Sequence, residues 1–353
     1  MPKLRQRLAQ IEGFLAGDAE HVADAFCLEA LNEHIGCFAR SHANPLSNRI
    51  SACATTPGAT TLLRVPGALL VIDGPFLLYR SFFALPDSIQ GADGNPVNAL
   101  LGATNALLRI AADREPRAIV VCFGAEAAEY RVKLFPEYHA ARPPVPNALA
   151  WQFAEAPKLF SAFAWSIENT DTLEADDLLG SLAQAEERAG GHTLIVTGDR
   201  DMYQCVGEHA TVLYLKSGTS GFEEVDQAEV QRRYGVAPAL VPDFIALRGD
   251  PSDGLPGAPG IGPKTAAELL ARHGSLEGVL SGAASERPRI AAVLQEEGAQ
   301  LRAFRDIATL RIEGLARPPD RATDLSGGAQ AAREYGMNRL AERLERAGSV
   351  SDL

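Results

Sequence analysis

Acidic side chains on four short segments of the chain have the types and spacing of metal ligands. Asp73 ends the apolar run in ALLVIDGP (68–75), and acids also end the apolar run in HTLIVTGDRD (192–201). Because open parallel sheets bind ligands at the carboxyl ends of their strands, we expect these acids to gather at one sheet edge. The full set is Asp73, Glu174, Asp176, Asp177, Asp199, Asp201, Asp250 and Asp253.

Gathered carboxylates suit divalent cations and the hydrolysis of phosphodiesters. Like charges packed together repel and raise one another's pKa unless cations neutralise them. Oxygen ligands without His or Cys favour Mg²⁺ or Mn²⁺ over zinc. Two such metals can activate water and stabilise both oxygens of an in-line displacement at phosphorus. The pattern therefore favours a two-metal hydrolase.

Each acidic segment also has a simpler explanation when it is taken alone. A single aspartate at a strand end, such as Asp73, usually caps the following helix. In TLEADDLLGSL, Glu174 and Asp177 share one face of the first helical turn, where acids are commonly solvated caps. The D-x-D of TGDRD is also common in turns. The shared site is favoured because four separate segments lead to the same edge of the sheet.

The stretch GDPSDGLPGAPGIGPKTA combines acids, flexible residues and a base in that order. Its glycines, among them Gly260 and Gly262, let the backbone come close to a phosphate. Lys264 and Thr265 open an apolar helix whose first amides would point at that phosphate. The stretch has the form of a helix-hairpin-helix at about 250–273, and a plain helix-turn-helix corner is the alternative.

The elements that must position these residues alternate between strand and helix. Apolar runs predict strands at 68–75, 118–124, 192–201 and 212–215, and helical periodicity predicts helices at 97–112 and 175–189. This alternation indicates an α/β class with a mostly parallel central sheet and flanking helices. The later pattern is helical: 228–234, 240–247, 263–273, 275–280, 290–310 and 328–346.

The length of 353 residues suggests two domains, or one large domain with extensions. We predict an N-terminal helical extension with a Ser, Thr, Pro and Gly-rich linker at 1–67, a sheet domain at 68–225 and a helical region at 226–353. The net charge of −12 argues against a general nucleic-acid binder, because phosphate contact needs Lys and Arg. It leaves room for a site where acids hold metal and basic residues gather elsewhere.

Cysteine usage and hydropathy indicate a cytoplasmic protein with no membrane partner. The five cysteines are odd in number and irregularly spaced, which fits a reducing compartment better than a disulfide framework. No apolar run is long enough for a membrane span, and the N-terminus lacks the features of a signal peptide.

Five stretches, in order along the chain, make the sequence recognisable: VIDGPFLLYRSFFAL, EYHAARPPVP, LEADDLL, TGDRDMYQ and RGDPSDGLPGAPGIGPKTA. Together they resemble the 5′ nuclease family, which includes the N-terminal domain of bacterial DNA polymerase I, phage 5′ exonucleases and flap endonucleases. The resemblance implies a PIN-like nuclease domain and a structure-specific 5′-3′ exonuclease or flap endonuclease of DNA replication and repair. No polymerase segment follows, so we expect a stand-alone member that acts on DNA, with RNA-primed ends also considered, as a monomer.

The resemblance also implies a role for each acid and for several basic residues. Asp73, Glu174, Asp176 and Asp177 would form a first metal site, and Asp199, Asp201, Asp250 and Asp253 a second, for two Mg²⁺ or Mn²⁺ ions. Arg80 would lie near the reacting phosphate beside the catalytic acids Asp73, Asp176 and Asp201. The hairpin, with Gly260, Gly262, Lys264 and Thr265, would grip duplex DNA and could hold a K⁺ ion.

Residues 125–150 correspond to the family's helical arch, through which a single-stranded 5′ end passes. Arg131, Lys133 and Arg142 would give the arch positive charge, and Tyr138 would stack on a base. Without the flanking motifs, a polar surface loop would be the preferred interpretation. His139 stands where the family usually has a lysine, and it supplies less positive charge at neutral pH.

A second departure concerns the metal site. Gly124 stands where the family usually has an acid after the second apolar run, so the first site would lose a carboxylate; Glu126 is two residues away. We expect a nuclease with weakened or altered metal dependence. The competing hypotheses are a non-catalytic binder of DNA junctions and a small PIN-type ribonuclease, against which the long helical region argues.

Overall fold

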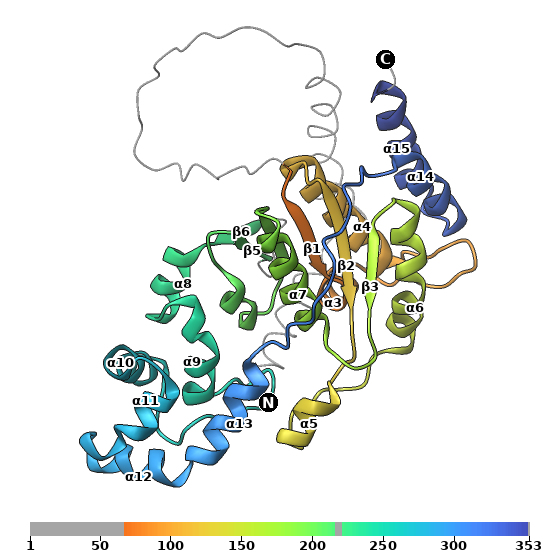
Figure 1. Ribbon diagram of the computed structural model, residues 1–353. Coiled ribbons are helices and arrows are strands. Elements are labelled where there is room, and N and C mark those ends of the chain that lie inside the picture. The colour runs from red at the N-terminus through yellow and green to blue at the C-terminus, as the bar shows by residue number, and fades with distance from the viewer. Residues whose placement is uncertain (1–66, 216–220, 352–353) are drawn as a thin grey trace, which may run out of the picture.

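A computed structural model describes residues 67–215 and 221–351 of the chain (Figure 1). The predicted extension and linker at 1–67 lie outside the described residues, except for Gly67.

A six-stranded sheet lies at the centre of the molecule in the order β3-β2-β1-β4-β5-β6. All neighbouring strands are parallel except β5 and β6, which are antiparallel. The mostly parallel α/β class predicted from the sequence is therefore confirmed. The strands are β1 (Leu69–Asp73), β2 (Ala118–Phe123), β3 (Ser166–Asn169), β4 (Thr193–Thr197), β5 (Ala210–Leu215) and β6 (Phe222–Val225).

The central strands are continuous apolar runs because both faces of the sheet are covered. In β1, Leu69 and Val71 belong to one hydrophobic cluster, whereas Leu70 and Ile72 belong to the other. The two edge strands, β3 and β6, were not predicted. Three of four residues in SIEN and two of four in FEEV are polar, and both strands are only partly buried, so they lack the apolar run of the central strands.

One face of the sheet is covered by helices from both ends of the described chain. They are α3 (Gly74–Ala84), α4 (Asn98–Arg114), α6 (Asn147–Ala162), α14 (Leu325–Glu334) and α15 (Asn338–Ser351). We predicted one helical stretch at 328–346, but the structure breaks it at Gly336, whose φ is 75°. We also placed it in the DNA-binding region, whereas α14 packs against α6 beside the sheet.

The other face is covered by α7 (Ala175–Arg188) and by the helical region that follows the sheet. Figure 1 shows this region and the pair α14 and α15 on opposite sides of the sheet. The predicted helix at 290–310 is two helices, because the backbone leaves helical geometry at Glu297. The region contains α8 (Gln227–Tyr234), α9 (Val241–Arg248), α10 (Pro263–His273), α11 (Leu276–Ser281), α12 (Pro288–Glu296) and α13 (Gly298–Ala308).

Short elements complete the described chain. They are α5 (Glu129–Leu134) and the 3₁₀ turns η1 (Asp201–Cys205), η2 (Pro238–Leu240) and η3 (Ala283–Ser285).

A segment without helix or strand, residues 309–324, returns the chain from α13 to α14 and is called the strap below. It crosses the front of the sheet in Figure 1. The amide of Glu313 donates to Ser181 Oγ of α7 at 2.8 Å, and the amide of Arg321 donates to the carbonyl oxygen of Arg117 at 2.8 Å. The strap therefore fixes the helical region to the sheet.

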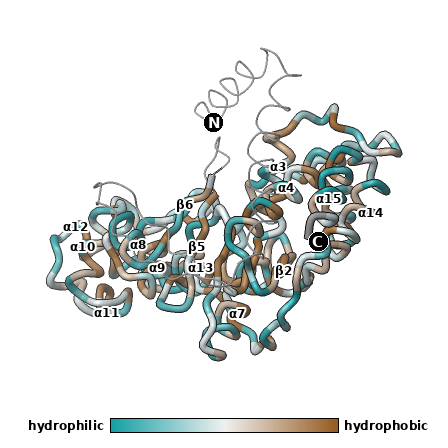
Figure 2. The backbone as a smooth tube through the Cα atoms, turned by 90° about the horizontal axis from the view of Figure 1, so that it is seen from above, coloured by the Kyte–Doolittle hydropathy of each residue, from teal (hydrophilic) through white to brown (hydrophobic). Residues whose placement is uncertain are grey.

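Viewed from above, hydrophobic segments lie toward the middle of the molecule, and the helical region extends to one side (Figure 2). Within the described ranges, no helix has both the length and the apolar character needed to cross a membrane.

Candidate active site

A cavity of about 960 Å³ opens at the carboxyl ends of β1, β2 and β4. Every acid predicted to bind metal lines this cavity except Asp177. The acids come from the end of β1, the start of α7, the turn after β4 and the loop before the hairpin. The topology therefore brings together the segments that the sequence spacing indicated, as expected for ligands of a parallel sheet.

Four of these acids form no ion pair with a basic side chain in the described part of the chain, and their pKa values are raised. Burial is the first cause for each, because protein surrounds the carboxylates even where part of their surface faces the cavity. For Asp176 the charges of Asp199 and Asp73 add to the effect of burial. The pKa of Asp199 rises to about 7. The group is Asp73, Asp176, Asp199 and Asp201, and we call it the unpaired acid group.

Thr197, which sequence analysis did not select, orients two members of this group. Its hydroxyl donates to Asp73 Oδ2 at 2.7 Å, and its oxygen accepts from the Asp199 amide at 3.0 Å. Asp73 Oδ1 also accepts from the Phe76 amide at 2.9 Å, which caps α3. Asp73 therefore has both roles that the sequence suggested. One of its oxygens caps α3, and the side chain also lines the cavity.

Asp250 and Asp253 lie on a loop closed by paired backbone hydrogen bonds between Asp250 and Leu255, each 2.8 Å long. Asp250 accepts from Arg248 Nη2 at 3.0 Å. Asp253 Oδ1 lies 3.1 Å from His139 Nε2 and 3.2 Å from Arg142 Nη2. Unlike the unpaired acid group, these two carboxylates already have basic partners within the protein.

Glu174 and Asp177 form a capping box at the start of α7. Asp177 is fully buried, lies outside the cavity, and accepts from both terminal nitrogens of Arg131 at 2.9 and 3.0 Å. The predicted role of Asp177 as a metal ligand does not fit this position. Asp177 is the third residue of α7, and its side chain points toward the backbone at the start of that helix and toward Arg131. Glu174 lines the cavity and lies 3.2 Å from Arg131.

The arch segment differs from the expected basic surface. Arg131 and Tyr138 are 3% and 5% exposed, and the Tyr138 hydroxyl donates to Glu174 Oε2 at 2.9 Å. Both side chains border the cavity, but each contacts a buried carboxylate, so neither forms part of the exposed basic surface that we expected of the arch. Lys133 is exposed, pairs with Glu129 at 2.7 Å and does not line the cavity. Arg142 is the arch residue that is both basic and accessible at the cavity.

His139 joins the arch to the loop before the hairpin. Its ring stacks on Tyr138 with centroids 3.8 Å apart, and its Nδ1 lies 2.8 Å from the carbonyl oxygen of Glu126. Its φ of 58° is in the left-handed region, which is unusual for a residue with a side chain. These contacts hold the imidazole against Asp253.

Gly124 lies where the chain passes closest to the start of α7. A Cβ atom there would lie 2.5 Å from both the Ala175 nitrogen and the Glu174 carbonyl carbon. The next amide, of Ala125, donates to the Leu173 carbonyl at 2.8 Å. The backbone therefore leaves no room for an acid at position 124 in this conformation. Glu126 is exposed and lines the cavity.

Arg80 lies on α3 and is half-buried, which lowers its pKa. It is not among the described residues that line the cavity. The expectation that it lies near the reacting phosphate therefore remains a prediction.

The predicted hairpin connects α9 and α10. Gly260 has a φ of 79°, a left-handed conformation that favours glycine. Gly262 caps α10 without a side-chain hydrogen bond, and the residues from Gly262 to Lys264 are exposed. Pro263 at the first position has no N–H, so the amides of Lys264 and Thr265 are the first that α10 offers to a ligand.

Several cavity residues were missed by sequence analysis. Arg200 stands between the two acids of the turn after β4, and Arg248 precedes the Asp250 loop, so their neighbours in sequence could have indicated them. An apolar side of the cavity is formed by Phe76, Tyr79 and Phe153. No pattern connected these three, because they come from α3 and α6.

The donor set suits a hard divalent cation. The carboxylates of the unpaired acid group supply oxygen alone, and a cation would offset the repulsion that raises their pKa values. Across residues 67–215 and 221–351, no three Asp, Glu, His or Cys side chains converge closely enough to enclose a metal ion. The residues therefore fit such an ion by their chemistry, and they would have to draw together around it.

Two family models match the chain. Residues 68–235 match the 5′-3′ exonuclease N-terminal resolvase-like domain, and residues 236–319 match the 5′-3′ exonuclease C-terminal SAM fold. The second match ends before α14, in agreement with the separate packing of that helix.

Curated relatives extend this match. A 5′-3′ exonuclease of Mycobacterium tuberculosis is 34% identical over 310 residues, which cover 79% of this chain and 97% of that protein. DNA polymerase I of Mycobacterium bovis is 36% identical over 268 residues, which cover 75% of this chain. The match spans only 30% of the polymerase.

A solved structure has the same fold. Bacteriophage T5 flap endonuclease, in a pseudo-enzyme-product complex with DNA and metal ions, matches with a TM-score of 0.56 and 16% identity. The match covers 81% of this chain and all of the T5 chain.

Proposed function

Because the chain belongs to the 5′-3′ exonuclease family, we propose that it is a metal-dependent 5′-3′ exonuclease or flap endonuclease that hydrolyses DNA phosphodiesters. The observation that carries this proposal is the unpaired acid group, which shares one cavity beside an exposed glycine-rich hairpin. Buried carboxylates without a basic partner are costly unless a cation binds them.

The unpaired acid group would hold Mg²⁺ or Mn²⁺, and two ions are proposed as in other two-metal sites. When bound, the metal supplies charge for the activation of water and for the reacting phosphate. Asp250 and Asp253 would bring basic partners to the site, because Arg248 contacts Asp250 Oδ2, while His139 and Arg142 contact Asp253 Oδ1 and leave its Oδ2 for a metal. The protein's own contribution is to hold these carboxylates in a surface cavity between the sheet and the helical region.

Basic and apolar side chains of the cavity would bind the DNA. Arg142 and Arg200 are placed to contact phosphates, while Phe76, Tyr79 and Phe153 offer an apolar surface to a base. The exposed amides of α10 and Lys264 would hold the duplex without reading its sequence. A K⁺ ion bound by the backbone carbonyls of the hairpin would also help to hold the duplex. We propose DNA as the partner and a cytoplasmic monomer as the working form.

The first metal site is proposed to be weaker than the second. Gly124 supplies no carboxylate, and Asp177 is held by Arg131. Mg²⁺ retains several waters in most protein sites, so fewer carboxylates need not prevent binding. We therefore expect cleavage with altered metal preference, with Mn²⁺ more effective than Mg²⁺.

The competing function is binding of DNA junctions without cleavage, which the missing acid at Gly124 favours. A 5′-flap substrate labelled at either end distinguishes the two functions and shows the direction of attack. Release of the flap or of 5′ nucleotides in Mg²⁺ or Mn²⁺ supports the nuclease. Tight flap binding in EDTA, with no cleavage in either metal by folded protein, supports the binder instead.

A further inference from the structure

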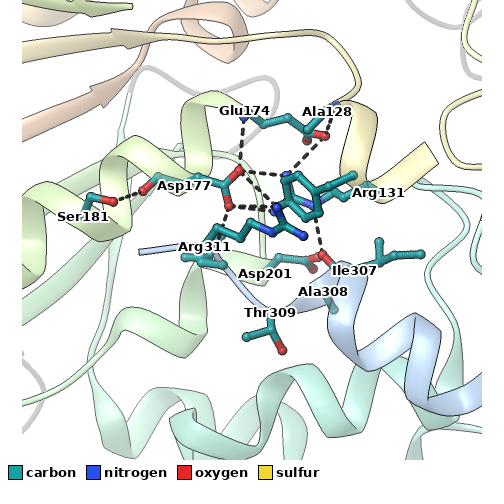
Figure 3. A network of polar contacts seen from close by, with 12 residues as sticks. Ala128, Arg131, Glu174, Asp177, Ser181, Asp201, Ile307, Ala308, Thr309 and Arg311 are labelled. Atoms are coloured by element: carbon teal, nitrogen blue, oxygen red, sulfur yellow. Dashed lines mark hydrogen bonds and ion pairs between the residues drawn. The ribbon is translucent and has the colours of Figure 1, made fainter. Parts of the chain in front are cut away.

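Arg131 joins three elements that are distant in the sequence. It comes from α5, its terminal nitrogens donate to Asp177 of α7, and its Nε donates to the carbonyl oxygen of Ile307 in α13 at 2.9 Å (Figure 3). Figure 3 shows Asp177 and Arg131 pointing toward one another between these elements. One guanidinium group therefore connects the arch, the helix that carries Asp176, and the helical region.

The carboxylate oxygens of Asp177 accept hydrogen bonds from groups inside the protein. Besides the two bonds from Arg131, it accepts from the Glu174 amide at 3.1 Å and from the Arg311 amide at 2.9 Å. The side chain is fully buried, and its Arg131 partner is 3% exposed. A buried ion pair of this kind is retained only with good geometry and added hydrogen bonds, and loss of one partner is strongly destabilising.

The same network reaches the acids that line the cavity. Arg131 Nη1 lies 3.2 Å from Glu174 Oε1, and that oxygen also accepts from the Ala128 amide at 2.8 Å. Asp176 is the neighbour of Asp177 in the first turn of α7. A movement of α5 that shifts Arg131 would therefore shift the cavity-lining carboxylates at the start of α7.

Tyr130 extends the network to the strap. Its hydroxyl lies 3.1 and 3.2 Å from the two Asp177 oxygens. Its ring has the Arg311 guanidinium 3.4 Å from its centroid and the Arg131 guanidinium at 4.8 Å. The strap thus contacts the arch through Arg311 and Tyr130, and Asp177 receives contacts from both.

We propose that Arg131 is a positioning residue that couples the position of α5 to the placement of Glu174 and Asp176, with Asp177 as its partner. This inference rests on the proposed nuclease function. Arg131 holds the start of α7 against α5 and α13, so the cavity-lining acids of that turn keep their place only while these contacts are made. Arg131 acts through Asp177 and Glu174 rather than by contact with a phosphate.

Two variants and one control test this proposal. Arg131→Lys keeps the charge but cannot donate twice to Asp177 and once to Ile307. The double variant Arg131→Gln with Asp177→Asn removes both charges and leaves neither buried alone. Arg188→Lys is the matched control, because Arg188 is an exposed arginine in the last turn of α7, at the opposite end of that helix from the network. Circular dichroism establishes that each variant is folded at the assay temperature.

Flap cleavage under steady-state conditions gives the first comparison. For both Arg131 variants we expect kcat to fall about 10- to 100-fold with KM within about twofold of wild type, and the Mg²⁺ concentration for half-maximal rate to rise. The control should match wild type. A folded double variant with unchanged kcat would overturn the proposal. So would a raised KM with a smaller salt dependence, which would indicate a phosphate contact.

Amide hydrogen exchange in EDTA gives a comparison that needs neither metal nor activity. We expect faster exchange in α5 and in the first turn of α7 for both Arg131 variants, and wild-type exchange for Arg188→Lys. Unchanged exchange at the start of α7 would overturn the coupling. If wild type cleaves no flap, the proposed function fails while this comparison still decides the coupling.

Discussion

His139 Nε2 lies 3.1 Å from Asp253 Oδ1, so the arch and the loop before the hairpin meet across the cavity. Arg142 contacts the same oxygen at 3.2 Å. A carboxylate expected to bind metal is therefore held by two residues expected to bind DNA. Binding of metal and of a DNA phosphate would replace these contacts together.

A lysine in place of His139 should strengthen DNA binding. His139 lines the cavity, and a lysine there would add a permanent positive charge beside it. We therefore expect flap affinity in EDTA to rise and the slope of log affinity against log salt concentration to steepen by about one counterion. Fluorescence anisotropy at several salt concentrations measures both. His209→Lys is the control, because His209 precedes β5 at the opposite end of the sheet. An equal gain in both variants would show a nonspecific effect of charge.

Asp176→Asn should raise the melting temperature of the metal-free protein and lower its rate of flap cleavage. Removing one charge from the unpaired acid group relieves repulsion, so the metal-free variant should melt at a higher temperature than wild type. Flap cleavage should fall at least about 100-fold, because a metal ligand is lost. Calorimetry in EDTA and a flap assay measure these effects. Asp226→Asn, which preserves the cap of α8, should leave both unchanged. A lower melting temperature for Asp176→Asn would count against the repulsion.

Stabilisation by Mg²⁺ should depend on pH. The pKa of Asp199 is raised from 3.8 to about 7 by burial and neighbouring acids, so the folded, metal-free protein binds more protons than the unfolded chain between these values. Its stability therefore falls as pH rises through this window. Mg²⁺ replaces those protons, so the increase in Tm on adding Mg²⁺ should be larger at about pH 8.5 than at about pH 6. NaCl of equal ionic strength is the control. An increase that does not depend on pH would contradict this origin.

Replacing Gly124 should destabilise the fold rather than repair the metal site. Any Cβ at this position meets the backbone of Glu174 and Ala175, so Gly124→Ala and Gly124→Asp should each lose about 1–3 kcal/mol of unfolding free energy. Gly314→Ala, with open space around it, is the matched control. Denaturant unfolding measures the loss. A large gain of cleavage in Gly124→Asp over Gly124→Ala would show that the backbone adjusts and that the carboxylate limits the rate.

The buried centre of the fold could be predicted from the sequence, because covered parallel strands are continuous apolar runs. Asp73 and Asp199 were placed correctly at one sheet edge, since both lie at the carboxyl ends of strands that run parallel. The edge strands β3 and β6 were missed because they are only four residues long and contain adjacent polar residues, as loops do. The predicted helices at 290–310 and 328–346 are each two helices in the structure. The breaks were missed because the apolar periodicity continues from one helix to the next.

The direction in which a side chain points could not be predicted from its type. Arg131 and Tyr138 were assigned to DNA because they are a base and an aromatic residue in the arch. The structure turns both toward Glu174, and Asp177 toward Arg131. Such orientations depend on contacts between α5, α7 and α13, which local sequence does not encode.

The central claim is that the unpaired acid group serves metal-dependent cleavage of 5′ flaps. The most direct measurement is single-turnover cleavage of a 5′-flap substrate in Mn²⁺ by wild type and by Asp201→Asn, with both proteins shown to be folded and to bind the flap. We predict release of the flap by wild type and loss of at least about 100-fold in rate for the variant. Equal rates for the two proteins, or no cleavage by wild type in either Mn²⁺ or Mg²⁺, would contradict the claim.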